Sequence, residues 1–297
     1  MITIGLLTYK RIDDIVSTIN EFSNSKLNNI ELIIVDNNEV SFEDQILSSI
    51  TIPSGWSLKY EHDGMNKGVA GGRNVIFNKA SGDIMIFLDD DVSIDNIDEV
   101  ILKTQDYFKS DNNIGALSYK ILDYKNKTVN RFEFPHKDKK KDKNKNFYTY
   151  YYIGAGHAIS RKCFDTVGQY SENRGLYGME EVEFSYNAIN KGYKILYCSD
   201  IIIQHKRSPE GRFANEIVAY NAFHNKSLLA ARHLKFRFFS THLLAWSVLY
   251  FRKTKNIKNV LQVYKKAVNT RLKQYKEYKF SESFYVSCKK LEAWLWW

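Results

Sequence analysis

The strongest constraint on the fold is that short apolar runs alternate with helix-like segments along the N-terminal part of the chain. Four runs have the length of buried strands: residues 2–8, 30–35, 58–61 and 84–88. In segments between and after them, such as residues 12–22 and 97–108, apolar residues recur at helical spacing. Strands that alternate with helices predict an α/β domain, with helices flanking a mostly parallel sheet.

Three of the four predicted strands end in a cluster of polar residues. These clusters are Thr8-Tyr9, Asp36-Asn37-Asn38 and Asp89-Asp90-Asp91. The carboxyl ends of parallel strands meet at one edge of a sheet, and ligands of open α/β sheets bind beyond that edge. The sequence therefore predicts one ligand site that the three clusters share.

The three adjacent carboxylates at residues 89–91 repel one another unless cations balance them. Mg²⁺ and Mn²⁺ prefer such oxygen ligands and commonly bridge to phosphates. The alternative is a solvated turn before a helix, because helix N-termini favour acidic residues. The apolar run directly before the acids favours a metal site, since it holds them at the end of a buried strand.

A glycine-rich segment, residues 64–72, leads into another predicted helix. Its glycines fit either a tight turn or a close approach of the backbone to a ligand. Asn66 and Arg73 flank the glycines and suit hydrogen bonds to a diphosphate or a sugar. The segment lacks the Gly-X-X-X-X-Gly-Lys pattern of a P-loop, which disfavours an NTPase.

These motifs and their order resemble the family 2 glycosyltransferases, which have the GT-A fold. Residues 8–11 (Thr-Tyr-Lys-Arg) resemble the family's opening Thr-Tyr-Asn-Arg, with Lys10 where Asn is usual. Residues 86–91 (Ile-Phe-Leu-Asp-Asp-Asp) resemble its Asp-X-Asp motif. Further segments that resemble family motifs are residues 33–38, 66–74, 154–156 and 178–183. Each motif is weak alone, but together they match in order across residues 2–207.

The resemblance implies an inverting, metal-dependent glycosyltransferase that uses a nucleoside-diphosphate sugar. The implied ligands of a Mn²⁺ or Mg²⁺ ion are Asp91, Asp89 and His205. The implied donor-binding residues are Thr8, Tyr9, Arg11, Asp36, Asn38, Asn66, Gly68, Arg73, Asp89 and Asp90. The implied acceptor side comprises Gly154, Ala155, Gly156 and Glu180.

Glu181 is the implied catalytic base, because it aligns with the second acid of the family's Glu-Asp pair. Glu180 is the alternative, since Met179 is inserted after the glycine and leaves the register open. An alcohol is a poor nucleophile at neutral pH, so the acceptor hydroxyl needs such a base. The non-catalytic alternative is that the acids of residues 180–183 stabilise the start of a helix through its dipole. For His205, the alternative to metal binding is that it is a structural or simply exposed histidine.

The C-terminal part of the chain is basic, whereas the residues before it are acidic on balance. Residues 206–297 contain 19 lysines and arginines and five acidic residues, whereas the preceding residues contain 24 and 29. We predict a catalytic domain at residues 1–235 and a basic, aromatic-rich helical extension at residues 236–297. A basic extension suits an anionic membrane surface or packing on the protein. A separate basic segment, residues 137–145, is expected to form a solvated loop, or else a mobile loop near the acceptor.

Three further expectations concern location and partners. No signal peptide or 18-residue apolar run is present and the cysteines are few, which predicts a cytoplasmic protein, peripheral at the inner membrane face. The expected acceptor is a saccharide or a polyprenyl-diphosphate-linked sugar, and the expected donor a UDP-hexose, with dTDP-rhamnose as the alternative. A homo-oligomer stays open. A sugar-nucleotide sensor and a nucleic-acid-binding protein are disfavoured, the second because the body is acidic and no nucleic-acid motif is present.

Overall fold

The structure, a computed structural model, describes residues 1–172, 178–208 and 214–296 of the chain. Its N-terminal half is a parallel sheet in the order β3-β2-β1-β4. The strands are β1 (Ile2–Thr8), β2 (Ile30–Asp36), β3 (Trp56–His62) and β4 (Ile84–Asp89). They confirm the four strands predicted from the apolar runs.

Helices cover both faces of this sheet, which is why β1 and β2 are buried along almost their whole length. α1 (Ile12–Asn20) and α4 (Ile97–Ser110) bury their apolar stripes on one face. α3 (Gly68–Lys79), α5 (Arg161–Val167) and α6 (Glu180–Asn190) cover the other face. The short α2 (Glu43–Ser49) packs beside α1.

The second half of the sheet is mixed. β8 (Gly156–Ser160) runs antiparallel between β4 and β6 (Ile114–Asp123), and β6 is parallel to β9 (Lys194–His205). Two short strands, β5 (Val92–Ser93) and β7 (Phe147–Thr149), pair antiparallel with β9. The parallel arrangement predicted for the sheet therefore holds for its first four strands, and β8 reverses direction beside them.

The second part of the glycine-rich segment forms the first turns of α3, where Gly72 lets the helix pack closely on β1. A Cβ atom added to Gly72 would lie 2.3 Å from Cδ1 of Leu7, and one added to Gly5 would lie 2.6 Å from Cγ2 of Ile76. Gly68 has a φ of +67°, in the left-handed region that glycine tolerates best. Both helix packing and backbone conformation therefore require glycines here.

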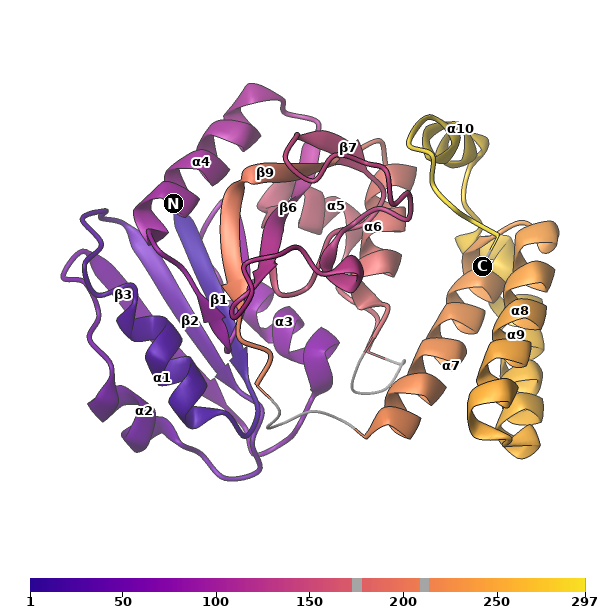
Figure 1. The fold of residues 1–297 in the computed structure, drawn as a ribbon, viewed down its shortest axis with the longest axis horizontal. Coiled ribbons are helices and arrows are strands. Elements are labelled where there is room, and N and C mark those ends of the chain that lie inside the picture. Colours follow the sequence, from indigo (N-terminus) through magenta and orange to yellow (C-terminus); the bar gives the residue numbers. More distant parts are fainter. Residues whose placement is uncertain (173–177, 209–213, 297) are drawn as a thin grey trace.

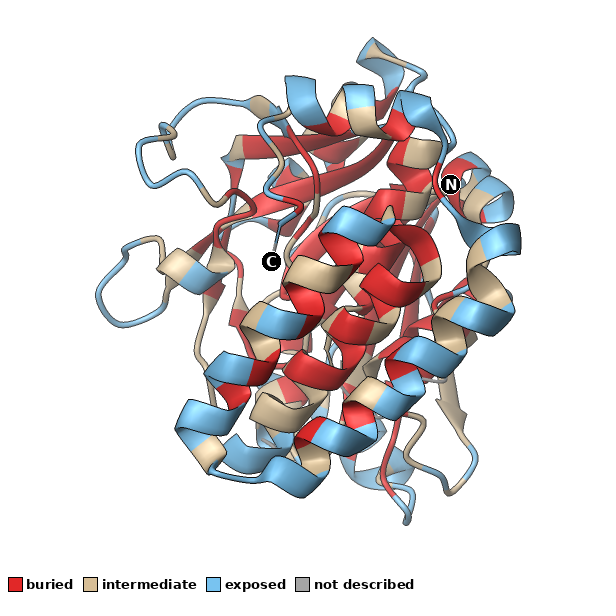
Figure 2. Ribbon diagram, turned by 90° about the vertical axis from the view of Figure 1, so that its right-hand side faces the viewer, coloured by how far each residue is buried: buried red, intermediate tan, exposed pale blue. Residues whose placement is uncertain are grey.

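Four helices follow the sheet: α7 (Asn215–His233), α8 (Phe236–Thr254), α9 (Ile257–Tyr278) and α10 (Glu282–Lys290). Figure 1 shows α7 between the sheet domain and the pair α8 and α9. In Figure 2, buried residues lie on the mutually facing sides of the helices, and their outer turns are exposed. One continuous apolar core includes Phe87 of β4, Phe223 of α7 and Val263 of α9. The division of the chain at residue 235 stays a prediction.

The remaining expectations about the chain can be placed on this fold. Lys139 and Lys140 of the predicted basic loop are exposed, whereas Lys137 and Lys141 are half-buried. The long apolar segment of α8 is amphipathic, with Phe239 and Leu243 buried and Leu244 exposed. None of the helices in the described ranges is long and apolar enough to cross a membrane. Trp297 lies outside the described residues.

Candidate functional site

The three polar clusters predicted at the strand ends meet at the carboxyl edge of the parallel sheet. Thr8 pairs with Asp36 in register, and Leu7 pairs with Asp89, so β1, β2 and β4 end side by side. The Thr8 hydroxyl is buried and has no hydrogen-bond partner among the described residues. The edge thus gathers carboxylates and an unused hydroxyl from segments far apart in the sequence.

A group of potential metal ligands lies at this edge. Asp89, Asp91 and His205 each offer one atom, and these atoms all lie within 4.8 Å of one another. His205 Nε2 is 3.1 Å from Asp91 Oδ1 and 4.0 Å from Asp89 Oδ2. The antiparallel pairing of Val92 with His205 carries the histidine to the acids, because it joins the end of β9 to the strand after them.

The other nitrogen of His205 contacts Glu133, a residue that the sequence motifs did not indicate. His205 Nδ1 lies 2.5 Å from Glu133 Oε1, and Arg207 binds the second oxygen of that carboxylate. Burial opposes a charge on His205, but the bonds to Asp91 and Glu133 outweigh it and raise the pKa of His205 to about 10. A carboxylate behind a ligating histidine is the usual means of orienting its ring.

The donor set fits a divalent cation. Two carboxylates and one imidazole suit Mn²⁺ or Mg²⁺ better than softer metals, and they leave positions for phosphate oxygens. Asp91 is fully buried, and its Oδ1 has no well-aligned hydrogen-bond donor among the described residues. Its Oδ2 accepts a hydrogen bond from the backbone N–H of Ser208 at 2.8 Å, which fixes the carboxylate in place.

Asp90, the middle acid, is engaged by Arg11. Arg11 Nη1 lies 2.9 Å from Asp90 Oδ1 and 3.3 Å from Asp91 Oδ2. Burial raises the pKa of Asp90 to about 7, although the guanidinium of Arg11 acts in the opposite direction. Asp90 is not part of the group formed by Asp89, Asp91 and His205. The structure therefore separates the three adjacent acids into two environments.

Asp36 holds together the loop after β2. Its Oδ1 accepts from the backbone N–H and the side-chain amide of Asn38, and its Oδ2 accepts from the Phe42 N–H and the Tyr60 hydroxyl, at 2.6–3.1 Å. Asn38 Oδ1 in turn accepts from the backbone N–H of Lys10. The Asp36 carboxylate is thus occupied by the protein, and it shapes the loop in which Asn38 lies.

Two other residues predicted to bind the donor, Asn66 and Tyr9, lie near the loop that follows β2. The side-chain oxygen of Asn66 accepts from the backbone N–H of Gly68 at 2.9 Å, so Asn66 fixes the start of α3. The Gly68 carbonyl accepts from the side chain of Asn37. Tyr9 is half-buried, and its hydroxyl lies 3.5 Å from Glu39. Both Asn66 and Tyr9 lie between elements rather than in the core.

Arg73 connects the acids of β4 with those of α6. Its Nη1 lies 3.4 Å from both Glu180 Oε1 and Glu181 Oε1, and its Nη2 lies 3.9 Å from Asp89 Oδ1. The same Nη2 donates to the Gly154 carbonyl at 3.2 Å. One buried guanidinium therefore places the potential base, the predicted acceptor loop and one metal ligand next to one another.

Glu180 and Glu181 differ in environment. The side chain of Glu180 is 4% exposed and that of Glu181 is 20% exposed, so Glu181 is the more accessible. Burial and the nearby Glu181 carboxylate raise the pKa of Glu180, and its Oε2 accepts from the Gly178 N–H at 2.9 Å. A raised pKa favours the protonated form of Glu180.

The predicted acceptor loop packs directly on Glu181. A Cβ atom on Gly154 would lie 2.5 Å from Glu181 Oε1, so a larger residue would push the Glu181 carboxylate from its place. Ala155 is buried, and Gly156 opens β8. The neighbouring tyrosines mostly pack, as with Tyr152, which stacks on His157 with the ring centroids 4.4 Å apart.

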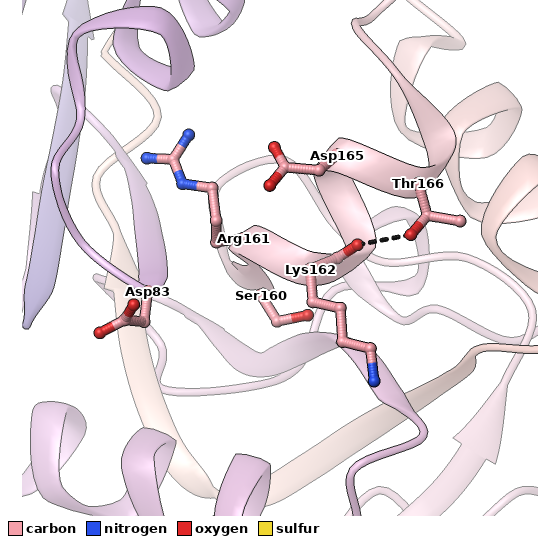
Figure 3. Close-up of a pocket in the computed structure, with 6 residues that line it drawn as sticks. All are labelled: Asp83, Ser160, Arg161, Lys162, Asp165 and Thr166. Carbon is pink, nitrogen blue, oxygen red and sulfur yellow. Dashed lines mark hydrogen bonds between the residues drawn. The ribbon is translucent and has the colours of Figure 1, made fainter.

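Glu183, the third acid of α6, belongs to a different contact. It lies 2.9 Å from His233 Nε2 and 3.5 Å from Arg232 on α7, and it thereby connects α6 to the helical layer. A surface hollow near Asp83 and Arg161 lies at the opposite end of β4 (Figure 3). Arg161 there donates to the carbonyls of Phe77, Ala80 and Gly82, which is a structural role. Neither feature contributes to the edge described above.

Comparisons with known proteins identify the family and the fold of the chain. The family model described as glycosyl transferase family 2 matches residues 3–168. An uncharacterised protein of Haemophilus influenzae is 40% identical over 169 residues, which are 57% of this chain and 91% of that protein.

Solved structures of low sequence identity share the fold. A structure of GalNAc-T7 with UDP, GalNAc and Mn²⁺ has a TM-score of 0.63 at 15% identity, covering 93% of this chain. The match spans only 55% of the GalNAc-T7 chain. Staphylococcus aureus TarS 1–349 gives 0.61 at 16% identity, covering 90% of this chain and 80% of TarS.

A third structure is the mannosyltransferase PcManGT of Pyrobaculum calidifontis in complex with GDP-Man and Mn²⁺. It gives a TM-score of 0.52 at 13% identity and covers 97% of this chain and 75% of that one. The family match extends over more than half of the chain and includes the strands that carry Thr8, Asp36 and Asp89. The chain therefore belongs to glycosyl transferase family 2 and is a glycosyltransferase with the GT-A fold.

Proposed function

We propose that this glycosyltransferase transfers a sugar, with inversion, from a nucleoside-diphosphate sugar to a hydroxyl of a saccharide or lipid-linked saccharide. The observation that carries the proposal is the position of Arg73 between Asp89 of the potential metal site and Glu181. A diphosphate bound at one end would place its sugar towards the other. A UDP-hexose is the expected donor, with dTDP-rhamnose as the alternative, for synthesis of surface polysaccharide or glycolipid.

A divalent cation, when bound by Asp91, Asp89 and His205, would neutralise the negative charge of the departing nucleoside diphosphate. Mn²⁺ is present in the GalNAc-T7 and PcManGT structures, which supports Mn²⁺ or Mg²⁺ here. Glu133 would orient His205. The Ser208 N–H would hold Asp91 against a change of rotamer.

The protein residues around the cation would bind the rest of the donor. Arg11 lies beside Asp90 and Asp91, where it can face the phosphates. Thr8, with its unused hydroxyl, and the loop of Asp36 and Asn38 would contact the nucleoside. Three glycosyltransferase structures of the same fold contain UDP, UDP-GlcNAc or GDP-Man, which supports a nucleotide-sugar donor for this site.

Glu181 is the group that would take the proton of the acceptor hydroxyl. It is the more accessible member of the glutamate pair, and its neighbour Glu180 has the raised pKa. The Gly154–Gly156 segment borders Glu181 and would form the floor of the acceptor side. Arg73 would hold the Glu181 carboxylate in place.

The outer face of α9 supports a peripheral contact with an anionic membrane. Exposed apolar residues spaced by four and seven positions share one side of the helix: Ile257, Leu261, Val268 and Leu272. Exposed lysines flank this strip, at Lys258, Lys265 and Lys276 among others. A basic amphipathic surface of this kind binds in the interface of anionic bilayers. The inner leaflet would bring the enzyme to a lipid-linked acceptor.

The Asp91→Asn variant tests the metal site. Loss of one ligand charge should lower transfer activity by at least about 10²-fold, through weaker cation and donor binding. Activity is measured as nucleotide release with Mn²⁺, and the matched control is Asp83→Asn at the far end of β4. Full activity of the Asp91→Asn variant, or of the wild type in EDTA, would contradict a metal-dependent reaction.

The Glu181→Gln variant tests the base. The amide keeps the size and hydrogen bonding of the side chain but cannot accept the proton, so transfer should fall by about 10²–10⁴-fold. Donor affinity, measured by calorimetry with UDP and Mn²⁺, should stay unchanged. If Glu180→Gln loses transfer in this way and Glu181→Gln does not, the base is Glu180.

The Glu180→Gln variant tests the protonation of the glutamate pair. Because the folded state raises the pKa of Glu180, the folded protein keeps a proton that the unfolded chain loses above the ordinary pKa of about 4.3. Wild-type stability from this group is therefore present at low pH and is lost as the pH rises to the raised pKa. The Tm of Glu180→Gln minus that of the wild type should become more positive between pH 5 and 9. A difference as constant with pH as that of the exposed Glu277→Gln control would contradict the raised pKa.

The double variant Leu261→Ser/Leu272→Ser tests the membrane contact. It removes two exposed apolar side chains without touching buried residues, so it should reduce sedimentation with phosphatidylglycerol vesicles several-fold. High salt should weaken binding of the wild type, because surface charges are screened. The control is Val40→Ser, an equally exposed apolar residue before α2. Absence of the wild type from anionic pellets at low salt would leave α9 without this role.

A further inference from the structure

His157, near the start of β8, is a buried polar side chain that the proposed reaction does not use. It is completely buried, and in the sheet it pairs with Phe87 of β4 and Ser118 of β6. Its ring stacks on those of Phe87 and Tyr152, with ring centroids 5.1 Å and 4.4 Å apart. Burying an imidazole among aromatic rings costs free energy unless its polar atoms are bonded. The hydrogen bonding of His157 therefore indicates what the side chain does.

One nitrogen of the ring makes its described hydrogen bond. Nδ1 of His157 lies 3.1 Å from the carbonyl oxygen of Gly154, and a carbonyl can only accept, so the proton is on Nδ1. Burial and repulsion from Arg73 hold the pKa of His157 well below its usual value, which keeps the ring neutral at pH 7. Nε2 is buried without a hydrogen-bond partner among the described residues. His157 is thus a neutral donor to one carbonyl group.

The same carbonyl oxygen also accepts a hydrogen bond from Arg73. The Nη2 atom of Arg73 lies 3.2 Å from it, and a carbonyl oxygen has two lone pairs, so it accepts from both side chains at once. The Nη1 atom of Arg73 lies 3.4 Å from the carboxylates of Glu180 and Glu181. A chain of contacts therefore runs from His157 through the Gly154 carbonyl and Arg73 to Glu181.

The segment around Gly154 lies between a potential metal ligand and the potential base. The carbonyl of Ala155 accepts from the backbone N–H of Asp89 at 3.2 Å. On the other side, Gly154 lies so close to Glu181 that a Cβ atom on the glycine would be 2.5 Å from Oε1. A shift of this segment would therefore change the position of Glu181 relative to Asp89.

We propose that His157 is a positioning residue for sugar transfer: its Nδ1–H fixes the Gly154 carbonyl and thereby holds the Glu181 carboxylate in place. The inference rests on the proposed function, because it takes Glu181 as the base. His157 is too deeply buried to contact a substrate, so it acts only through the loop. Since a displacement of about 1 Å can cost about 10²-fold in rate, loss of this hydrogen bond should lower turnover.

The paired variants His157→Asn and His157→Leu separate positioning from packing. Asparagine places an amide N–H where Nδ1 lies but leaves space unfilled, whereas leucine fills apolar space and cannot donate. If His157 only packed, the leucine variant would be the more active one. We expect the reverse: kcat for release of UDP from UDP-glucose with Mn²⁺ should fall about tenfold or more in His157→Leu and be clearly higher in His157→Asn. Wild-type kcat in His157→Leu, or no recovery in His157→Asn, would overturn the proposal.

The matched control is His242→Leu on α8. His242 is also a buried imidazole with Nε2 bonded to a carbonyl, that of Leu295 at 2.9 Å, and its Nδ1 has no hydrogen-bond partner in the described ranges. This variant should keep the wild-type kcat, and a loss as large as that of His157→Leu would mean that any such packing change suffices. In calorimetry, UDP with Mn²⁺ should bind the wild type and all three variants equally. Weaker binding in His157→Leu would place the defect in donor binding and contradict a role towards Glu181.

An NMR signal tests the same hydrogen bond without turnover. The chain contains two Gly–Ala steps, at residues 115–116 and 154–155, so carbonyl-¹³C glycine and ¹⁵N alanine together label two identifiable carbonyl groups. A hydrogen bond moves a carbonyl ¹³C signal to lower field. His157→Leu should therefore move the Gly154 signal to higher field, His157→Asn should restore it, and the Gly115 signal should stay in place.

The two readouts distinguish failure of this inference from failure of the proposed function. A Gly154 signal that does not change in His157→Leu would overturn the inference, whatever the activity. A wild type that releases no nucleotide, while the Gly154 signal responds as expected, would count against the proposed function and leave the hold of His157 on the loop supported.

Discussion

The interaction on which the site depends is the burial of the Arg73 guanidinium among carboxylates. Burial opposes its charge, but Glu181, Glu180 and Asp89 outweigh this and keep the pKa of Arg73 above its usual value. Arg73 is on α3, and its partners come from α6, from the end of β4 and from the Gly154 loop. Removing one member of such a buried network leaves the others uncompensated, which costs several kcal/mol. The charge of one side chain therefore fixes the relative positions of three segments.

Two glycines near Arg73 leave the room that this buried guanidinium and its partners need. Gly72 permits α3 to approach β1, and Gly154 leaves room for Glu181, so that a long side chain from α3 reaches across to α6. At the neighbouring end of the edge, His205 and Arg11 balance Asp89, Asp90 and Asp91. Each of the three adjacent acids at this edge thus lies beside a cation from another element. This density of charge supports our proposal that the edge binds a divalent metal and a diphosphate.

The C-terminal helices pack against the sheet domain through contacts made by α6. Glu183 follows Glu180 and Glu181 on α6 by less than one turn, and it pairs with His233 and Arg232 of α7. Tyr186 of the same helix packs on Phe284 of α10, with ring centroids 5.5 Å apart. The position of Glu180 and Glu181 therefore depends on helices that lie beyond the matched family region.

The sequence by itself determined the first four strands, the helices α1, α3 and α4 and the residues that end β1, β2 and β4, because hydrophobic periodicity is a local property of the chain. The order of its motifs also indicated the family. It also drew attention to His205 and to the pair Glu180 and Glu181. Only the tertiary structure decided that β8 is antiparallel, that Glu133 backs His205, and that Glu183 faces α7 instead of the site. It also decided that Asp89 and Asp91 lie with His205 while Asp90 faces Arg11. These features arise from pairings between residues far apart in the chain, and no local pattern encodes a partner that burial and strand register select.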